Sequence, residues 1–410
     1  MPSSRIDRIT TPPHKGVGHL EFLTLIATLM ALKSISIDIM LPALPVIGKD
    51  LDVHDPNNRQ LLITSYLTGI ALGALIFGPL SDWLGRKRIL LFGLVLFAVS
   101  TFFSATAGTF EILLLARLIQ GVGAASARVV SISMVRDWYS GWQMARVMSL
   151  AMTLSIIAPI FAPSLGEIIL LFAPWRWIFF LLTSVAITVL LWSALRLPES
   201  LHQKKRRKPG VRSVLGAYKA TLTIRITFGY MVATALLMGC LFGFINSAQQ
   251  IFMNVFGLGE SFPFIFGLMP LSLVVSSIIN AQIVESWGLL KISHLAILCF
   301  TLVNIVTVFI SSSEYITLWS FVTLQCLSFF FLGFIGANFN TLAMEPLGKI
   351  AGTGSAMLGF STTIISAFLG AGIGHYFDGS TLPYTIGCSI LSLTATIVVF
   401  ITEKGCLFKT

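Results

Sequence analysis

Twelve long apolar stretches alternate with short polar segments along the chain of 410 residues. Each stretch reaches the roughly 20 residues that a helix needs to cross the hydrocarbon core of a membrane. The runs are continuous and lack the alternation of barrel strands, so they predict helices. The predicted fold is therefore an all-α integral membrane protein with spans near residues 19–41, 60–80, 89–108, 111–135, 145–172, 177–197, 222–247, 261–284, 290–311, 315–343, 351–374 and 382–402.

The spans form two sets of six, separated by a polar segment. We expect a tail at 1–18, a six-helix bundle at 19–197, a basic linker at 198–221, a second six-helix bundle at 222–402 and a tail at 403–410. In transporters built from two such parallel halves, the substrate site lies between the halves, near the middle of the membrane.

Composition supports a membrane protein, because 55% of the residues are apolar and only 11% are charged. Soluble domains carry about 25% charged residues, so a single soluble core is excluded. The five cysteines include no C-x-x-C pair, and we interpret them as small apolar residues. No pattern in the sequence predicts a metal site or a cofactor.

The basic residues predict the orientation. Of the 27 Lys and Arg, 21 fall on the two ends or on the loops that share their side of the membrane, and only Lys49, Arg59 and Arg176 fall on the other side. This bias predicts that both termini are cytoplasmic. The basic run 204–208 fits the linker that maintains this topology and contacts anionic lipid, so the net charge of +10 does not indicate nucleic-acid binding.

Four charged residues lie inside the first six spans and away from the span ends: Lys33, Asp38, Arg117 and Arg128. A charge at the centre of a bilayer costs roughly 2.5–3.5 kcal/mol on insertion scales, so these side chains should face a cavity or a partner. Asp38 and Arg117 have similar depths and are expected to pair across the bundle. Burial favours the protonated form of a carboxyl group, so Asp38 is expected to bind and release a proton. The alternative is a permanently ionised Asp38–Arg117 bridge that only fixes helix packing.

The remaining intramembrane polar residues predict a substrate cavity. Arg117 and Arg128 are about three helical turns apart and share one helix face with Gln120. Lys33 should point about 140° away from Asp38 around the first helix. Neutral amides of the second half suit the orientation of varied ligands in an apolar cavity. The predicted lining is Lys33, Gln120, Arg128, Asn246, Gln249 and Asn338.

Four motifs in the first half resemble those of a known family. Residues 78–88, GPLSDWLGRKR, resemble the G-x-L-x-D-x-x-G-R-[KR] signature of the major facilitator superfamily. Residues 117–125 are similar to the R-x-x-Q-G-x-G-A motif of its proton-coupled members. Residues 38–45, DIMLPALP, resemble a segment of the Bcr/CflA-type multidrug and phenicol exporters, and the sixth span closes on the familiar LPES at 197–200.

The resemblance implies a twelve-helix rocker-switch transporter that exports small molecules such as antibiotics against proton entry. Asp38 would carry the proton with Arg117 as its partner. Asp82 would bond to a helix terminus and to Arg86, latching the cytoplasmic side, although the basic residues there also set the topology. The predicted gate comprises Asp82, Gly85, Arg86 and Arg88, together with Pro159, Pro163 and Gly166 of the fifth span, where the prolines would bend the helix or simply kink its packing.

Two departures from the family pattern affect these expectations. Glu167 stands where the antiporter motif has a small residue, which puts a close helix contact in question. Lys33 adds a cation to the first span, giving three cations against one mid-span carboxylate. We therefore hypothesise tolerance for neutral or anionic substrates over purely cationic drugs.

Other functions remain open at this stage. No G-x-x-x-x-G-K-[ST] motif occurs, so ATP is not the expected energy source and the chain is not expected to be an enzyme. The alternatives are a dedicated metabolite or siderophore transporter and a non-transporting membrane sensor or scaffold. We expect a monomer in the bacterial inner membrane whose partners are a small-molecule substrate, protons and membrane lipid, with no nucleic acid.

Overall fold

The computed structural model describes residues 17–139, 141–203, 206, 216, 218–219, 221–313 and 316–408. Within these ranges the chain is helical and contains no strand. Twelve of the described helices are long and apolar enough to cross a membrane, which confirms the predicted spans. Residues 1–16 of the predicted tail and most of the predicted basic run lie outside the described residues.

The first span is longer than the sequence predicted and changes helix type near its end. An α-helix to Asp38 is followed by a 3-10 turn and a short helix to Asp50. Pro42 and Pro45 stand at the starts of these two elements, and the residue before a proline is disfavoured in α-helix. The elements of the first half are α2 (His19–Asp38), η1 (Leu41–Ala43), α3 (Leu44–Asp50), η2 (Pro56–Gln60), α4 (Leu61–Leu84), α5 (Arg86–Ala105), α6 (Phe110–Trp138), α7 (Gly141–Phe172) and α8 (Arg176–Arg196).

The second half repeats the count of six spans. Its first span continues past the predicted end at residue 247 through a π-helical stretch to Val255. The elements are α10 (Arg225–Gln250), η4 (Ile251–Val255), η5 (Gly259–Ser261), α11 (Phe262–Trp287), α12 (Leu289–Ser311), α13 (Leu318–Met344), η6 (Glu345–Ile350), α14 (Ala351–His375) and α15 (Leu382–Thr402).

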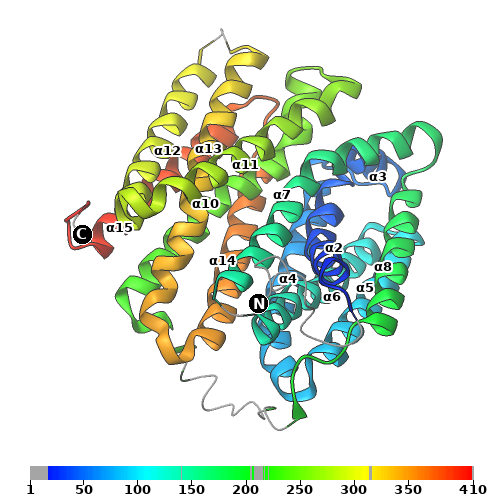
Figure 1. Ribbon diagram of the computed structural model, residues 1–410. Helices are drawn as coiled ribbons and strands as arrows, with labels where there is room; N and C mark the ends of the chain where they lie inside the picture. The colour runs from blue at the N-terminus through cyan, green and yellow to red at the C-terminus, as the bar shows by residue number, and fades with distance from the viewer. Residues whose placement is uncertain are drawn as a thin grey trace, which may run out of the picture.

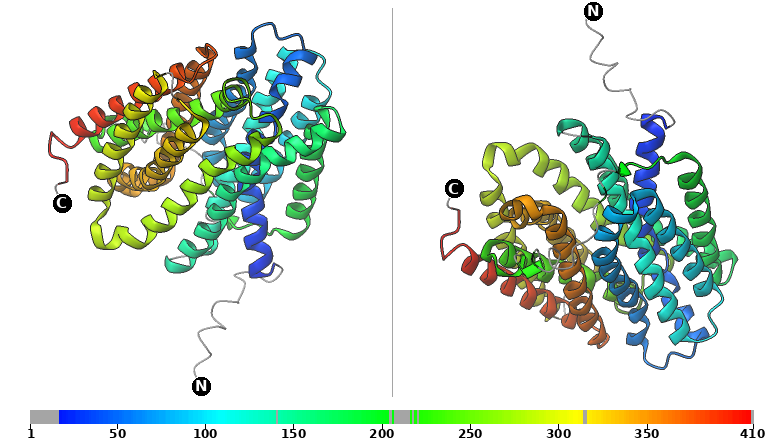
Figure 2. Two further views of the ribbon diagram at one scale, coloured as in Figure 1. Left: turned by 90° about the horizontal axis from the view of Figure 1, so that it is seen from above. Right: turned by 90° about the horizontal axis from the view of Figure 1, so that it is seen from below.

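Figure 1 shows the blue-to-green helices of the first half beside the green-to-red helices of the second, and both views of Figure 2 show the two groups side by side. Helices α4 and α14, and α7 and α11, make the extensive contacts between the groups. We call the end that contains His19 and Leu84 the inner end, following the orientation predicted from sequence, and the end that contains Asp50 and Gln60 the outer end.

Small residues allow the helices to approach closely. A Cβ on Gly69 of α4 would overlap the Leu118 carbonyl oxygen of α6, and one on Gly370 of α14 would lie 2.7 Å from the Phe242 carbonyl carbon of α10. Gly73 makes a similar contact with α6. Without a hydrophobic force between helices in lipid, such close packing stabilises the bundle.

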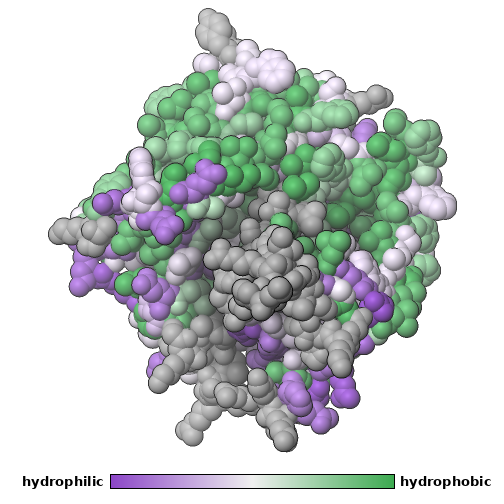
Figure 3. All heavy atoms as spheres, in the orientation of Figure 1, coloured by the Kyte–Doolittle hydropathy of each residue, from purple (hydrophilic) through white to green (hydrophobic). Residues whose placement is uncertain are grey.

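Large apolar side chains are exposed on the outside of the bundle, as lipid requires. Phe92, Phe172 and Phe309 are each more than half exposed. Figure 3 shows apolar side chains over the upper part of one face and polar ones gathered toward its lower and left edges. Such a surface would aggregate in water and is suited to a membrane.

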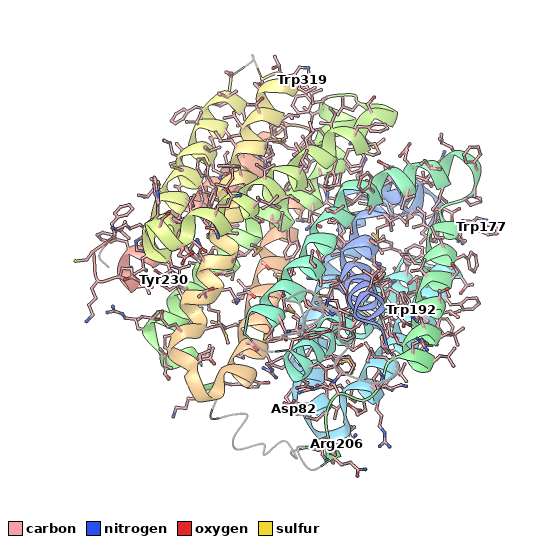
Figure 4. The ribbon with its side chains drawn as sticks, in the orientation of Figure 1. Asp82, Trp177, Trp192, Arg206, Tyr230 and Trp319 are labelled. Carbon is pink, nitrogen blue, oxygen red and sulfur yellow. The ribbon has the colours of Figure 1, made fainter. Side chains whose placement is uncertain are left out.

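The C-terminal segment is fixed to the second half at its inner end. The Tyr230 hydroxyl donates to Glu403 Oε1 at 2.8 Å and lies 3.2 Å from His294 Nε2, and Phe408 N–H donates to His294 Nδ1 at 3.0 Å (Figure 4). Because Nδ1 accepts, a neutral imidazole carries its proton on Nε2 and donates it to Tyr230. The chain therefore folds back on α10 and α12 after α15 ends.

Candidate transport site and gates

Asp38 is the last residue of α2, and only 4% of its surface is exposed. Gly166 of α7 packs directly on the residue that follows, because a Cβ there would overlap the Ile39 carbonyl oxygen. A close contact between α7 and the end of α2 is therefore present at Gly166. The sequence had put such a contact in question because Glu167 stands at the next position. The end of α2 is held between the core of the first half and α7.

Arg117 is fully buried on α6. Its Nη1 donates to Gln120 Oε1 at 2.7 Å, and its Nε reaches the Leu62 carbonyl oxygen at 3.5 Å. Gln120 Nε2 in turn donates to Thr101 Oγ1 at 2.8 Å. Nη2 has no hydrogen-bond partner within the described part of the chain. Arg117 and Gln120 thus connect α4, α5 and α6.

The predicted Asp38–Arg117 ion pair is not formed. No ion pair among the described residues includes Asp38. The Arg117 guanidinium carbon lies 4.3 Å from the centre of the Tyr66 ring, and the Tyr66 hydroxyl donates to the Lys33 carbonyl oxygen at 3.2 Å. Tyr66 interacts electrostatically with both Arg117 and Asp38. Equal depth did not imply contact, because the Arg117 guanidinium packs on the Tyr66 ring of α4 instead.

Lys33 and Arg128 occupy the middle of the bundle. Lys33 is half-buried, and Arg128 is exposed. Because charged side chains avoid lipid, we infer that their accessible surface borders a hollow in the protein interior. Lys33 interacts electrostatically with both Asp38 and Arg128.

The predicted amides of the second half are buried, and one is fully engaged. Asn338 of α13 and Asn280 of α11 exchange two hydrogen bonds of 3.1 Å each. Asn246 Nδ2 donates to the Phe242 carbonyl oxygen, whereas its Oδ1 has no partner among the described residues. Gln249 Nε2 lies 3.4 Å from Met253 Sδ. Asn338 therefore joins helices, and Asn246 keeps an acceptor available to another group.

A cluster of charges fixes the inner end of the first half. Arg86 is 3% exposed and contacts Asp82 at 2.5 Å and Asp137 at 3.2 Å, and its backbone N–H donates to Glu199 Oε1 at 2.8 Å. Gly85 precedes it with φ +106°, a conformation that favours glycine. Figure 4 places Asp82 and Arg206 together at this end, and Arg206 Nη2 lies 3.6 Å from Glu199 Oε2.

Sequence reasoning found only part of this cluster. Arg88, predicted with the gate, is exposed and makes no hydrogen bond or ion pair with described residues. Asp137 and Glu199 were missed as Arg86 partners. Their positions in the sequence could have indicated them. Asp137 lies beside Arg136 at the end of the fourth span, and Glu199 lies in the LPES sequence that ends the sixth.

Hydrogen bonds between the two halves lie at the outer end. Asn57 Nδ2 donates to the His375 and Phe377 carbonyl oxygens at 2.9 and 3.1 Å, and Gln250 Nε2 donates to Asn57 Oδ1 at 2.7 Å. Gln60 donates to Gln250 as well. These contacts close the outer end, and no sequence motif indicated them.

The predicted prolines lie inside a continuous helix. α7 runs through Pro159 and Pro163 without ending, although a proline lacks the N–H of the helix ladder. Gly267 of α11 packs beside this region, because a Cβ on it would lie 3.3 Å from the Ile160 carbonyl oxygen. The prolines therefore stand where the two halves meet.

Comparisons with known proteins agree with this architecture. Residues 26–371 match the family model described as Major Facilitator Superfamily. The chain is 30% identical over 365 residues to an uncharacterized MFS-type transporter, YdgK, of Bacillus subtilis, covering 88% of this chain and 90% of that protein. It is 26% identical to the bicyclomycin resistance protein homolog of Haemophilus influenzae (91% and 94% covered) and 29% identical to the multidrug resistance protein MdtL of Escherichia fergusonii (93% and 96% covered).

A solved structure shares the fold. The human organic anion transporter MFSD10 (TETRAN) superposes with a TM-score of 0.71 at 18% identity, covering 92% of this chain and 98% of that one. At this identity the likeness establishes the arrangement of helices alone.

Proposed function

The chain belongs to the major facilitator superfamily, and we propose that it is a proton-coupled exporter of small amphipathic molecules such as antibiotics. The bicyclomycin- and multidrug-resistance names of two relatives support this substrate class. The bacterial sources of those relatives and the twelve spans support a multi-pass protein of the bacterial inner membrane. We further propose that it works as a monomer with both termini in the cytoplasm.

The observation that carries the proposal is the environment of Asp38. Its carboxyl group is buried at a break between helices, without an ion pair among the described residues, and interacts electrostatically with Lys33. Burial opposes ionisation of such a carboxyl group and the cation supports it, so we propose that both protonation states occur during the transport cycle. Asp38 is therefore the proposed proton carrier, and Arg117 acts on it through Tyr66.

Alternating access would proceed from the outer-closed arrangement. A substrate enters the hollow beside Lys33 and Arg128 from the inner end, and the halves then tilt to open the outer end. The outer contacts are neutral hydrogen bonds worth about 0.5–1.5 kcal/mol each, so they can break once per cycle. In the open-outside state, the Asp82–Arg86 cluster is proposed to close the inner end, and the α7–α11 contact beside Pro159 and Pro163 is proposed to open with the outer end.

Proton entry supplies sufficient energy for this work. A potential of 100 mV yields about 2.3 kcal/mol per proton, which corresponds to roughly fiftyfold accumulation of a neutral substrate before any pH gradient is counted.

The proposal is tested by substrate-stimulated proton flux in proteoliposomes. We expect Asp38→Asn to lower this flux at least tenfold, because an amide cannot exchange a proton. Asp52→Asn is the matched control, since Asp52 is an exposed carboxylate at the outer end whose φ of 52° asparagine tolerates well. Flux that persists in Asp38→Asn would show that another group carries the proton.

A further inference from the structure

Lys33 and Arg128 lie at similar depths on two helices that pack together. At 1.5 Å per residue, Lys33 is about 21 Å from the inner end of α2, and Arg128 is about 15 Å from the inner end of α6. Both are thus near the middle of the membrane, and both have accessible surface that borders the inferred hollow. Two cations in this position repel each other and need a counter-ion.

The protein supplies less negative charge than these two cations require. No ion pair among the described residues includes Lys33 or Arg128, and Asp38 is the carboxylate that interacts electrostatically with Lys33. Arg117 of α6, which packs on the ring of Tyr66, adds a third positive charge.

The other helices that pack against α2 do not change this balance at mid-depth. α7 carries Glu167 nearer the outer end, next to the Gly166 contact with Ile39. α8 carries charge only at its ends, as Arg176 and Arg196. Lys33, Arg128 and Asp38 together therefore have one excess positive charge when Asp38 is ionised, and two when it is protonated.

We propose that Lys33 and Arg128 bind the anionic group of an amphipathic substrate, a carboxylate or a sulfonate, and that this binding is coupled to proton uptake by Asp38. The anion site rests on the two cations. The coupling rests on the proposed function, because it takes Asp38 as the group that binds the proton.

The sign of the coupling follows from competition for Lys33. A bound anion and the Asp38 carboxylate are both attracted to this cation and repel each other. Anion binding therefore favours the protonated form of Asp38. By reciprocity, protonation of Asp38 strengthens anion binding by the same factor. A cationic substrate has the opposite effect and competes with the proton. Binding of a cation in this hollow is therefore accompanied by release of a proton, whereas binding of an anion is accompanied by uptake of a proton.

The test uses three matched naphthalene compounds: naphthoate, naphthamide and the naphthylmethylammonium cation. Binding to the purified full-length protein is followed by fluorescence, and a pH indicator in weakly buffered solution reports proton exchange. We expect naphthoate to bind more tightly than naphthamide and to take up a proton. Binding of naphthoate no tighter than naphthamide, or accompanied by proton release, would overturn the proposal.

Variants separate the anion site from the proton carrier. Lys33→Gln and Arg128→Gln are each expected to weaken naphthoate binding on the order of tenfold while leaving naphthamide binding near its original value. Asp38→Asn is expected to strengthen naphthoate binding several-fold and to abolish the proton uptake. Lys49→Gln removes an exposed cation at the outer end and should change neither quantity.

Two further outcomes keep the interpretation distinct from misfolding and from failure of the proposed function. Lys33→Arg retains the charge and should keep naphthoate binding within a few-fold of the original protein. If Asp38→Asn still exports with proton flux but naphthoate binding depends on Lys33, the anion site stands and the carrier assignment is wrong. Unchanged naphthoate affinity in both Lys33→Gln and Arg128→Gln removes the anion site.

Discussion

The two halves of the protein share a span count but differ in what their interiors contain. The first half encloses Asp38, Arg117, Lys33 and Arg128, whereas the described mid-membrane positions of the second half hold neutral amides such as the Asn280–Asn338 pair. Charges inside a membrane are costly and usually functional, while amides commonly join helices. The difference indicates that the first half carries the ionic chemistry and the second half supports it.

The turns at the inner end also differ between the two halves in the charges around them. Gly85 begins α5 with φ +106°, and Gly288 begins α12 with φ +84°. The backbone turn is therefore common to both halves. A Cβ at Gly85 would collide with Glu199, whereas one at Gly288 would meet open space. The turn belongs to the fold, and the charged cluster around it is specific to the first half.

The largest expected effect comes from breaking the inner charge cluster. Arg86→Ala removes the buried guanidinium that contacts Asp82 and Asp137, and we expect the free energy of unfolding to fall by about 2–3 kcal/mol, since charge-assisted hydrogen bonds of a buried side chain are lost. Unfolding by SDS titration in detergent micelles measures this. Arg88→Ala is the control, because Arg88 is exposed and should change stability by less than about 0.5 kcal/mol. Equal losses of stability in Arg86→Ala and Arg88→Ala would refute a stabilising role for the charge cluster.

The two inner turns allow a sharper comparison. Gly85→Ala and Gly288→Ala each force a side chain into positive φ, at a cost of about 1–2 kcal/mol. At Gly85 the new Cβ also displaces Glu199, which accepts the Arg86 N–H. We expect Gly85→Ala to be the more destabilising by about 1 kcal/mol in the same titration. A greater loss at Gly288 would mean that the open turn is the more constrained one.

The Asn280–Asn338 pair of the second half should join two helices and should not be needed for transport. Asn280→Leu leaves the Asn338 amide without its partner and should cost about 1 kcal/mol. The double variant with Asn338→Leu should recover most of that loss in a double-mutant cycle and keep the transport of a neutral compound. If both amides are needed for transport at unchanged stability, they belong to the substrate path.

The smallest effect is expected at the outer end. Asn57→Ala removes hydrogen bonds to the His375 and Phe377 carbonyl oxygens, and at about 0.5–1 kcal/mol this shifts the equilibrium toward the open-outside state two- to fivefold. Spin labels on the outer loops of the two halves would report the longer distance. Asn58→Ala, for which no side-chain hydrogen bond is found, serves as the control. No shift would place the closure in the apolar contacts between α7 and α11.

Hydropathy was sufficient to predict twelve spans, because lipid requires long apolar helices regardless of their packing. It could not predict that the first span continues through a 3-10 turn to Asp50, since that extension depends on prolines and on packing against α7. The sequence also identified the buried charges, because charge within an apolar run is visible without any structure.

The partners of those charges could not be predicted in the same way. Residue spacing gives depth and direction on one helix, but it does not give the rotation of one helix against another. For this reason Arg117 was assigned to Asp38, although Tyr66 of α4 occupies its guanidinium face. The Arg86 partners Asp137 and Glu199 come from distant parts of the chain and carry no shared motif.

Two of the hydrogen bonds at the outer end join a side chain of one half to the main chain of the other. Asn57 donates to peptide oxygens at the end of α14 and just after it, and those oxygens are present whatever residues stand at 375 and 377. The contacts of Gln250 with Asn57 and Gln60 instead join side chains of both halves. A search for covarying pairs among related sequences could therefore detect the contacts of Gln250, but it would overlook the two that end on peptide oxygens.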